Sequence, residues 1–333
     1  MSSLIKTSLI IPAWNAENTI KECLLSALKA ESSPDEIIVV DDLSSDKTRD
    51  IVKNLKLKYP NIKLLQLENR GGPANARDKG AKKAKGDIIF FTDSDVVLLD
   101  NTFANAIATF KKYNADAVSG IYSPTPLNKG KTQLYKALFF NYHFMRHKNP
   151  FEYETFNGQI AAIKKSVYNI SGGYNSKIKW GVDNENEEFG RRIKKKFKLY
   201  LDPNFQVKHH FPDFRKLTQT YFFRVSTYMY IFLENFKFES KGGAAADVGF
   251  STFSVFLFCM ALIGGIIFND YLYYVALFFF MIWLFLIYNF FLFVYKLKGS
   301  FIFYALLLNL WFSNIISLGA IWGGIKWIKG RRD

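Results

Sequence analysis

The chain has 333 residues, a length typical of about two structural units. It carries 44 lysine and arginine residues against 29 aspartate and glutamate residues, and the net charge of +15 indicates an anionic partner. No RNA-binding signature accompanies this charge, so it favours an anionic membrane surface over nucleic acid. The only cysteines, Cys23 and Cys259, exclude a disulfide framework and fit a reducing cytoplasm.

The N-terminal third alternates between strand-like and helix-like patterns. Short apolar runs predict strands at residues 7–13, 36–40 and 62–67. Apolar residues at helical spacing, or a helix-forming composition, follow them at residues 20–28, 51–55 and 75–84. Strands that alternate with helices predict a parallel, doubly wound α/β sheet of the Rossmann type.

Residues 86–97, GDIIFFTDSDVV, combine a buried strand with an acidic end. Ile88 to Phe91 are typical of a strand that is buried on both faces, and this strand stops at Asp93-Ser94-Asp95. In a parallel sheet, ligands bind beyond the carboxyl ends of the strands. Two carboxylates one residue apart can bind one Mg²⁺ or Mn²⁺ ion, which takes further ligands from phosphates. A lone Asp-x-Asp is more often an exposed loop, so the prediction depends on the other motifs.

Four motifs occur together in a characteristic order. They are PAWNAENTI from residue 12, VVDDLSSDKT from residue 39, NRGGPANARDKGAKKAKGD from residue 69 and TDSD from residue 92. As a set they resemble an inverting family 2 glycosyltransferase of the GT-A fold, of the membrane-anchored bacterial type. The resemblance covers roughly the first 240 residues and implies a site for a nucleotide-sugar donor.

The resemblance implies roles for residues at the ends of the predicted strands. Those that would border the donor are Pro12, Ala13, Asn15, Glu17, Asp41, Asp42, Arg77 and Asp93. Asp95 would bind the metal, Mn²⁺ or Mg²⁺, which stabilises the charge that grows on the leaving diphosphate. His209, in a Val-x-His segment, is a candidate third metal ligand or leaving-group contact. The alternatives are that Asp41 and Asp42 only cap a helix and that His209 is a neutral loop residue.

The segments that match the family's acceptor side depart from its pattern at one position. Gly158, Gln159 and Arg192 would lie at the acceptor. The family's catalytic base is the aspartate of a Glu-Asp-x-Glu-Phe motif, but here the matching residues are Glu185 and Asn186, and an amide cannot accept the proton. The candidate bases that remain are Asp183, Glu185, Glu187 and Glu188, with Asp183 and Glu185 as first choices. The alternative is that residues 183–188 are a solvated acidic start of a helix.

The last third of the chain predicts membrane-associated helices. Residues 250–268 and 271–295 are each long enough to span a bilayer, and the lysines that flank them place the catalytic domain in the cytoplasm. Residues 301–325 form a third hydrophobic segment, but the basic residues after it conflict with a third crossing. The predicted parts are a GT-A domain over residues 1–215, an amphipathic interfacial helix and linker over 216–245, and a membrane domain of two to three helices over 246–330.

These features predict an enzyme of the inner (cytoplasmic) membrane that moves a sugar, with inversion, from a UDP- or GDP-linked donor. The expected acceptor is a lipid-linked or cell-surface glycan, and no nucleic-acid partner is expected. Two alternatives stay open. A polyprenyl-phosphate glycosyltransferase needs no base because its acceptor is already an anion, and a non-catalytic membrane scaffold would keep the nucleotide fold without a base.

Overall fold

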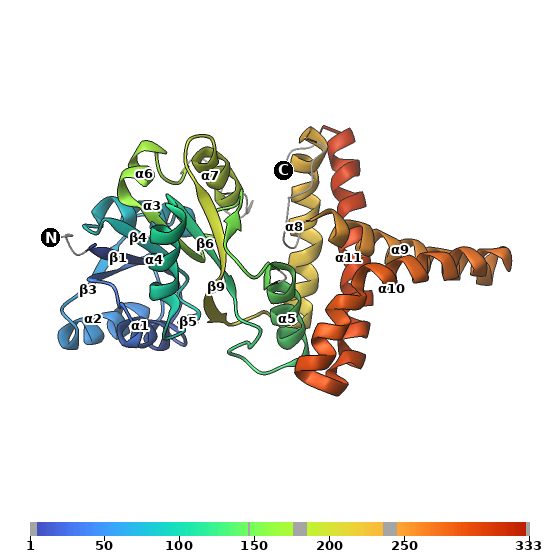
Figure 1. Ribbon diagram of the computed structural model, residues 1–333, viewed down its shortest axis with the longest axis horizontal. Helices are drawn as coiled ribbons and strands as arrows, with labels where there is room; N and C mark the ends of the chain where they lie inside the picture. Colours follow the sequence, from blue (N-terminus) through green and yellow to red (C-terminus); the bar gives the residue numbers. More distant parts are fainter. Residues whose placement is uncertain (1–4, 146, 176–184, 236–244, 331–333) are drawn as a thin grey trace. The chain divides into compact units, whose positions relative to one another are not determined.

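The chain divides into two compact units (Figure 1). A computed structural model describes residues 5–145, 147–175, 185–235 and 245–330. The first unit comprises Met1–Leu127 and Met145–His210, and the second comprises Asn128–Phe144 and Phe211–Asp333. The first combines strands and helices, whereas the elements described in the second are helices.

The first unit is built on a mixed sheet of nine strands within the described residues. The strands are β1 (Thr7–Ala13), β2 (Glu36–Asp41), β3 (Ile62–Gln66), β4 (Ile88–Thr92), β5 (Val96–Leu98), β6 (Ala117–Tyr122), β7 (Phe151–Glu152), β8 (Ile160–Lys164) and β9 (Leu199–His209). Their order is β3-β2-β1-β4-β8-β6-β9-β5, with β7 paired to β9. Strands β3, β2, β1 and β4 are parallel, which confirms the predicted α/β class, and β8 runs antiparallel to both of its neighbours.

The direction in which strands are added reverses between β1 and β4. The chain adds β2 and then β3 on one side of β1, and it then crosses back to place β4 on the other side. The pairing of β1 with β4 ends at Ile10 and Phe91, so Pro12, which has no N–H to donate, lies beyond the last pair. Such a reversal opens a crevice at the carboxyl ends of the strands, where open α/β sheets bind ligands.

Helices cover both faces of the sheet. They are α1 (Ile20–Lys29), α2 (Thr48–Lys58), α3 (Gly72–Lys83), α4 (Thr102–Tyr113), α6 (Lys165–Ile170) and α7 (Glu185–Lys194). Successive strand residues point to opposite faces, so Phe90 contacts Phe103 of α4 while Phe91 packs against Tyr168 of α6 on the other side. Phe189 of α7 belongs to the same core as Phe91. Strand β4 is therefore buried on both faces, as predicted, and its acidic end is held in a fixed place.

Three details of this unit differ from the sequence-based prediction. Helix α3 begins at Gly72 rather than at residue 75, because Pro73 suits the first turn of a helix. The apolar pattern predicts two separate strands at residues 199–203 and 205–209, but they form one strand, β9, which has a register irregularity where it pairs with β6. Strand β5 was not predicted, and it pairs antiparallel with the end of β9.

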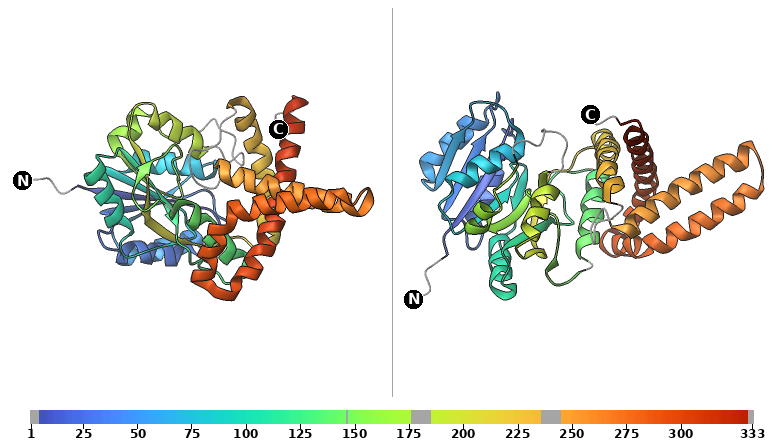
Figure 2. Two further views of the ribbon diagram at one scale, coloured as in Figure 1. Left: turned by 45° about the vertical axis from the view of Figure 1, so that its right-hand side comes forward. Right: turned by 90° about the horizontal axis from the view of Figure 1, so that it is seen from above.

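The second unit contains long apolar helices. They are α5 (Lys131–Met145), α8 (Phe214–Asn235), α9 (Ala246–Ile267), α10 (Tyr271–Lys298) and α11 (Ile302–Ile328). Helices α9 and α10 run side by side as a hairpin in all views (Figures 1 and 2). The Oδ1 atom of Asn269 accepts a hydrogen bond at 2.9 Å from the N–H of Tyr271, the first residue of α10, in the short turn between the two helices. Ala246–Ile267 and the nearly continuous helical stretch Tyr271–Ile328 are long and apolar enough to cross a membrane.

Small and polar residues of α11 face other helices of the unit. Gly319 and Gly323 lie against the backbone of α8, where an added Cβ atom would come within 2.6 Å of a carbonyl oxygen. Asn309 accepts a hydrogen bond from the indole of Trp283 at 3.1 Å and donates one to Tyr135 at 2.9 Å. This buried network joins α5, α10 and α11.

Candidate functional site

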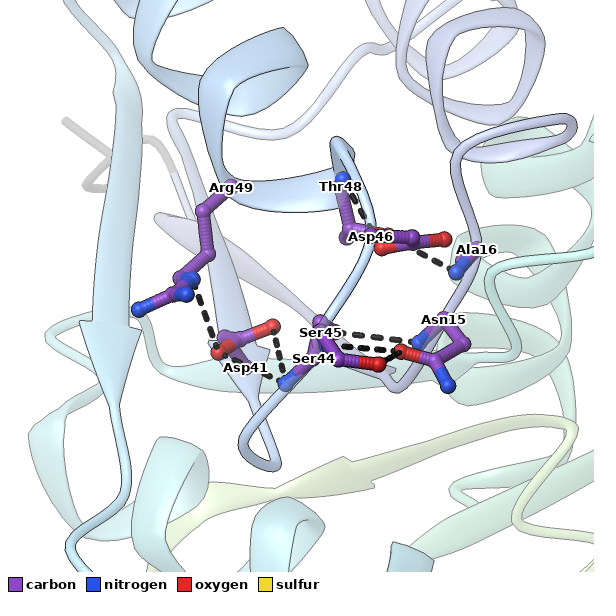
Figure 3. Close-up of polar contacts among 8 residues, drawn as sticks. All are labelled: Asn15, Ala16, Asp41, Ser44, Ser45, Asp46, Thr48 and Arg49. Carbon is purple, nitrogen blue, oxygen red and sulfur yellow. Dashed lines mark hydrogen bonds and ion pairs between the residues drawn. The ribbon is translucent and has the colours of Figure 1, made fainter.

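The loops that follow β1 and β2 are tied together by side-chain hydrogen bonds (Figure 3). Asn15 has a left-handed backbone (φ 48°), which asparagine tolerates better than most residues. Its N–H donates to Oγ of Ser44 at 3.0 Å, and its Oδ1 accepts the N–H of Ser45 at 2.8 Å. Asp41 is fully buried, accepts the N–H of Ser44, and has its Oδ2 3.9 Å from Nε of Arg49. Two of the predicted donor-binding residues, Asn15 and Asp41, thus shape one rim.

Three further predicted donor-binding residues belong to the same rim. Ala13 accepts the N–H of Asp42 on its carbonyl oxygen at 2.8 Å, and Pro12 precedes it within buried β1. The carboxylate of Glu17 accepts the N–H of Lys47 at 3.0 Å, just before α2 begins. These contacts order the backbone at the strand ends, and direct contacts with a donor remain a prediction.

Asp42 connects this rim to helix α3. Its two carboxylate oxygens accept the N–H groups of Gly71 and Gly72, each at 2.9 Å. A carboxylate at this position satisfies backbone donors that would otherwise be unpaired at the start of a helix, and it interacts favourably with the helix dipole. The helix-capping alternative is therefore observed for Asp42. It also fixes the helix from which Arg77 reaches the site.

The sheet brings two acidic residues and one histidine together. The candidate ligand atoms of Asp93, Asp95 and His209 all lie within 4.8 Å of one another, and Nε2 of His209 is 3.4 Å from Oδ1 of Asp95. Opposite ligands of an ion with bonds of about 2.1 Å are about 4.2 Å apart, so a small side-chain adjustment lets this set hold one divalent ion. Strand β5 explains the proximity, because its first residue, Val96, pairs with His209.

The charges in this group suit a cation. Burial, and next the negative charge of Asp93, raise the pKa of Asp95 from the usual 3.8 to about 7. A carboxylate that loses solvation beside another carboxylate gains stability from a metal ion or another positive charge. The residues therefore fit Mn²⁺ or Mg²⁺ with oxygen and imidazole ligands.

Arg77 is the buried cation of the site. Its Nη2 donates to Oδ1 of Asp93 at 2.6 Å, and its Nη1 is 3.9 Å from Oε1 of Glu185. Burial lowers the pKa of Arg77, but Asp93, Tyr174 and Glu185 outweigh that effect, so the pKa is raised and the guanidinium stays charged. Its Nε has no hydrogen-bond partner among the described residues, although it is buried. An unpaired buried donor of this kind is suited to an anionic ligand.

Asn186 lies beside the two predicted acceptor residues Gly158 and Gln159. Its Oδ1 accepts the N–H of Gly158 at 3.2 Å and the hydroxyl of Tyr174 at 3.3 Å, and its Nδ2 donates to Oε1 of Gln159 at 3.4 Å. A Cβ atom on Gly158 would lie 2.3 Å from Oη of Tyr174 and 3.1 Å from Cζ of Arg77, so only glycine fits. The amide that replaces the family's aspartate thus positions this loop.

The four candidate bases differ in their surroundings, and Glu187 is a half-buried residue of α7. Glu185, the first residue of α7, has a side chain that is 14% exposed and reaches toward Arg77. Glu188 forms a two-point ion pair with Arg192, at 2.5 and 2.8 Å, and Arg192 also donates to the carbonyl oxygens of Ser171 and Gly173. Asp183 lies outside the described residues. The structure brings Glu185 to the Asp93 side of the site, whereas Glu188 and Arg192 stabilise α7.

Sequence reasoning missed one residue of this site and one strand. Tyr174 donates a hydrogen bond to Asn186, and its hydroxyl lies 2.3 Å from where a Cβ atom on residue 158 would be. No motif identified it. The short apolar run Val96-Val97-Leu98 after the acidic motif was the available signal for β5.

A family match supports the assignment suggested by this geometry. Residues 8–170 match the family described as Glycosyl transferase family 2. The chain carries a family 2 glycosyltransferase domain. The resemblance predicted from the four motifs is thereby confirmed, and all of the strand-end residues described above except His209 lie within or close to the matched segment.

Two curated relatives illustrate the similarity of the glycosyltransferase domain. A 119-residue match to the poly(ribitol-phosphate) beta-N-acetylglucosaminyltransferase TarS of Staphylococcus aureus is 37% identical and covers 34% of this chain and 20% of TarS. A 115-residue match to the UDP-Glc:alpha-D-GlcNAc-diphosphoundecaprenol beta-1,3-glucosyltransferase WfgD of Escherichia coli is 39% identical and covers 34% of this chain and 45% of WfgD. These matches span less than half the length of either relative.

A solved structure shows that the fold is shared over nearly the whole chain. The mannosyltransferase PcManGT from Pyrobaculum calidifontis, solved with GDP-Man and Mn²⁺, has a TM-score of 0.59 and 17% sequence identity. The similarity covers 99% of this chain and 89% of that one. At this identity the likeness shows the fold, and it agrees with the GT-A fold predicted for the glycosyltransferase domain.

Proposed function

We propose that the chain transfers a sugar, with inversion, from a nucleoside-diphosphate donor to a lipid-linked or cell-surface glycan at the cytoplasmic face of the inner membrane. The observation that carries this proposal is the grouping of Asp93, Asp95 and His209 at the carboxyl edge of a family 2 glycosyltransferase domain. A bound Mn²⁺ or Mg²⁺ ion would supply positive charge to the leaving diphosphate. PcManGT was solved with Mn²⁺, which supports this cofactor.

The residues around the metal group suit a diphosphate. Arg77 remains charged, is held by Asp93, and has a free Nε donor among the described residues. The rim formed by Asn15, Asp41 and Asp42 follows strands β1 and β2 and would border the nucleoside. WfgD is named for UDP-Glc and PcManGT was solved with GDP-Man, so both donor bases belong in a test of this chain.

Transfer with inversion needs one displacement. An acceptor oxygen forms a bond to the anomeric carbon while the bond from that carbon to the diphosphate oxygen breaks, and the nucleoside diphosphate leaves with the electron pair. The proton of the acceptor hydroxyl passes to a carboxylate, and Glu185 is the best placed of the described candidates because it lies at the buried edge near Arg77. Asp183 stays a candidate for the same role.

The acceptor is proposed from the relatives and from the helical unit. TarS is named for poly(ribitol-phosphate) and WfgD for a diphosphoundecaprenol, so each is named for an acceptor that contains phosphate. The two helical stretches that are apolar enough to cross a membrane fit an acceptor anchored in the bilayer. By the positive-inside rule, the lysines that flank residues 250–295 support a cytoplasmic position for the glycosyltransferase domain.

The transfer assay uses the full chain in detergent. UDP-Glc, UDP-GlcNAc and GDP-Man, each radiolabelled in the sugar, are incubated with bacterial lipid extract and with Mn²⁺ or a chelator. We expect label in the lipid or glycan fraction for one donor, and loss of that label on chelation. Release of nucleoside diphosphate without transfer in every combination would contradict the proposal.

A polyprenyl-phosphate acceptor is a second candidate because Asn186 replaces the family's base. Asn186→Asp separates the two candidates. With a hydroxyl acceptor, the new carboxylate keeps or raises the transfer rate, because it restores the group that takes the proton. With a phosphate acceptor it lowers the rate, because like charges repel. A non-catalytic scaffold would bind a donor in a metal-dependent way and transfer nothing with either residue.

A further inference from the structure

Lys136 of α5 and Tyr221 and Arg224 of α8 form a polar cluster in the helical unit that the transfer reaction does not use. Nζ of Lys136 donates a hydrogen bond to Oη of Tyr221 at 2.9 Å. The same ammonium lies 4.5 Å from the centre of the Tyr221 ring and 5.6 Å from that of Phe140. Within the described residues, Lys136 forms no ion pair with a carboxylate. Its charge is met by a hydroxyl and by aromatic rings.

A second cation acts on this lysine. Arg224 follows Tyr221 by three residues on α8, so both side chains lie on one side of that helix. Burial, and next the positive charge of Arg224, lower the pKa of Lys136 to about 7. Lys136 is half-buried and Arg224 is exposed. An ammonium that loses solvation near a second cation is destabilised, and an anion bound beside Lys136 would offset that cost.

The segments that carry the cluster are basic and rich in aromatic residues. Residues 128–144 and 211–235 contain six basic residues, Lys129, Lys131, Lys136, Arg215, Lys216 and Arg224, against the two acidic residues Asp213 and Glu234. Phe139 and Phe140 of α5 and Phe222 and Phe223 of α8 are near the cluster in sequence, and Phe223 is 61% exposed. An anionic group with a long apolar tail matches both features.

Phosphate is the anion that these donors suit best. A guanidinium can donate two parallel hydrogen bonds to phosphate oxygens, and an ammonium adds a point charge with further donors. The hydroxyl of Tyr221 accepts a hydrogen bond from Lys136 and can donate its own proton to a phosphate oxygen. The unit also contains helical stretches apolar enough to lie in a membrane, where phosphate groups are carried by lipids.

We propose that Lys136, Tyr221 and Arg224 bind the phosphate group of an amphiphilic lipid whose hydrocarbon chain lies along the aromatic residues of α5 and α8. This inference rests on the proposed function and deepens it, because a polyprenyl phosphate is the second candidate acceptor, and lipid binding is tested without a donor. If the transfer assay fails, lipid binding can still be measured separately. If lipid binding fails, the proposed transfer to a hydroxyl acceptor is unaffected.

Binding is measured on the full chain in a neutral detergent, by isothermal titration with farnesyl phosphate at pH 7. Farnesol, which lacks the phosphate, and inorganic phosphate, which lacks the tail, are the two comparison ligands. We expect saturable binding of farnesyl phosphate that is at least about tenfold tighter than that of either comparison ligand. Equal binding of farnesol means a purely apolar site, and equal binding of inorganic phosphate means a free-anion site. Either result overturns the proposal.

Variants then assign the site. Lys136→Met and Arg224→Met should each weaken farnesyl phosphate binding by about tenfold or more, which is about 1.4 kcal/mol. Lys136→Arg, which keeps the charge, should stay within about threefold, and Tyr221→Phe, which keeps the ring, should lose about threefold. Lys129→Met removes the same charge from an exposed position of the same unit and is the matched control.

Two results contradict the assignment. If Lys129→Met weakens binding as much as Lys136→Met does, the effect is one of overall charge. If Tyr221→Phe and Arg224→Met both bind like the unchanged protein, the cluster does not hold the phosphate. Circular dichroism of each variant identifies any that fails to fold, and in that case Lys136→Arg and Tyr221→Phe still decide the question.

Discussion

Substituting Asp95 by asparagine should change stability in opposite directions without and with metal. Asp95 is negative at pH 8 and lies beside Asp93 in a partly buried place, and its pKa is raised from 3.8 to about 7. A carboxyl group whose pKa is higher in the folded than in the unfolded protein destabilises the fold at a pH above both values. Asparagine carries no charge at any pH in this range, so Asp95→Asn removes that cost and should raise the stability of the chelated protein.

The magnitude follows from the pKa rise and the exposure of the side chain. A rise from 3.8 to about 7 would correspond to about 4 kcal/mol for a fully buried group. The side chain is 40% exposed, so solvent screens the charges and we expect about 1 kcal/mol instead. For a unit of this size that is a Tm increase of about 2–4 °C at pH 8 in the presence of EDTA. At pH 5, where the Asp95 carboxyl is mostly protonated, the difference should shrink.

In the presence of Mn²⁺, the unchanged protein should be more stable than Asp95→Asn. A ligand present at about 100 times its Kd stabilises the folded protein by about 2.7 kcal/mol, and loss of one of three ligands should weaken binding by about 100-fold or more. At the same Mn²⁺ concentration Asp95→Asn should therefore gain no more than about 0.4 kcal/mol. Thermal unfolding is followed by intrinsic fluorescence of the full chain in detergent, with and without Mn²⁺.

The control for this experiment is Asp100→Asn, the same substitution at an exposed position after β5. It should leave both the Tm in EDTA and the Mn²⁺ response unchanged. An Asp95→Asn protein with the full Mn²⁺ response refutes the metal assignment. A variant that is less stable than the unchanged protein in EDTA refutes the account of charge repulsion between Asp93 and Asp95.

Three further substitutions test other parts of the glycosyltransferase domain. Glu185→Gln should lower kcat for a hydroxyl acceptor by about 100-fold or more, because the group that takes the proton is lost. Initial rates measure this with exposed Glu152→Gln as the control, and an unchanged kcat points to Asp183 or to an anionic acceptor. Asp42→Asn should lower the free energy of unfolding by about 2 kcal/mol, because one of the two charge-assisted hydrogen bonds to the start of α3 is lost. A thermal melt that matches that of the unchanged protein would exclude the capping role. Gly158→Ala should reduce the rate of transfer by about tenfold or more, because the added Cβ atom displaces neighbouring side chains. The control is Gly324→Ala, which has open space around its Cβ position and should keep the rate; equal rates for both variants would show that the Gly158 loop is not critical.

The amino-acid sequence determined the elements and the edge of the sheet at which polar residues gather. The alternation of short apolar runs with helical spacing is a local property, and it predicted β1 to β4 with the helices between them. The carboxyl ends of parallel strands share one edge, so the placement of Asn15, Asp41 and Asp93 at that edge followed from the predicted parallel order. The hydrophobic length of the last helices was equally a local property.

Only the tertiary structure decided which side chains meet. Pairing of β5 with the end of β9 brings His209 to Asp95 across more than a hundred residues of sequence, and strand register over such a separation depends on packing that no local pattern encodes. The same holds for Asn186, whose hydrogen bonds to Gly158 and Gln159 show a positioning role that its mismatch with the family motif did not reveal. Helix α5 likewise joins the helical unit rather than the sheet that precedes it, because its buried aromatic face, with Tyr135 at its centre, packs against α10 and α11.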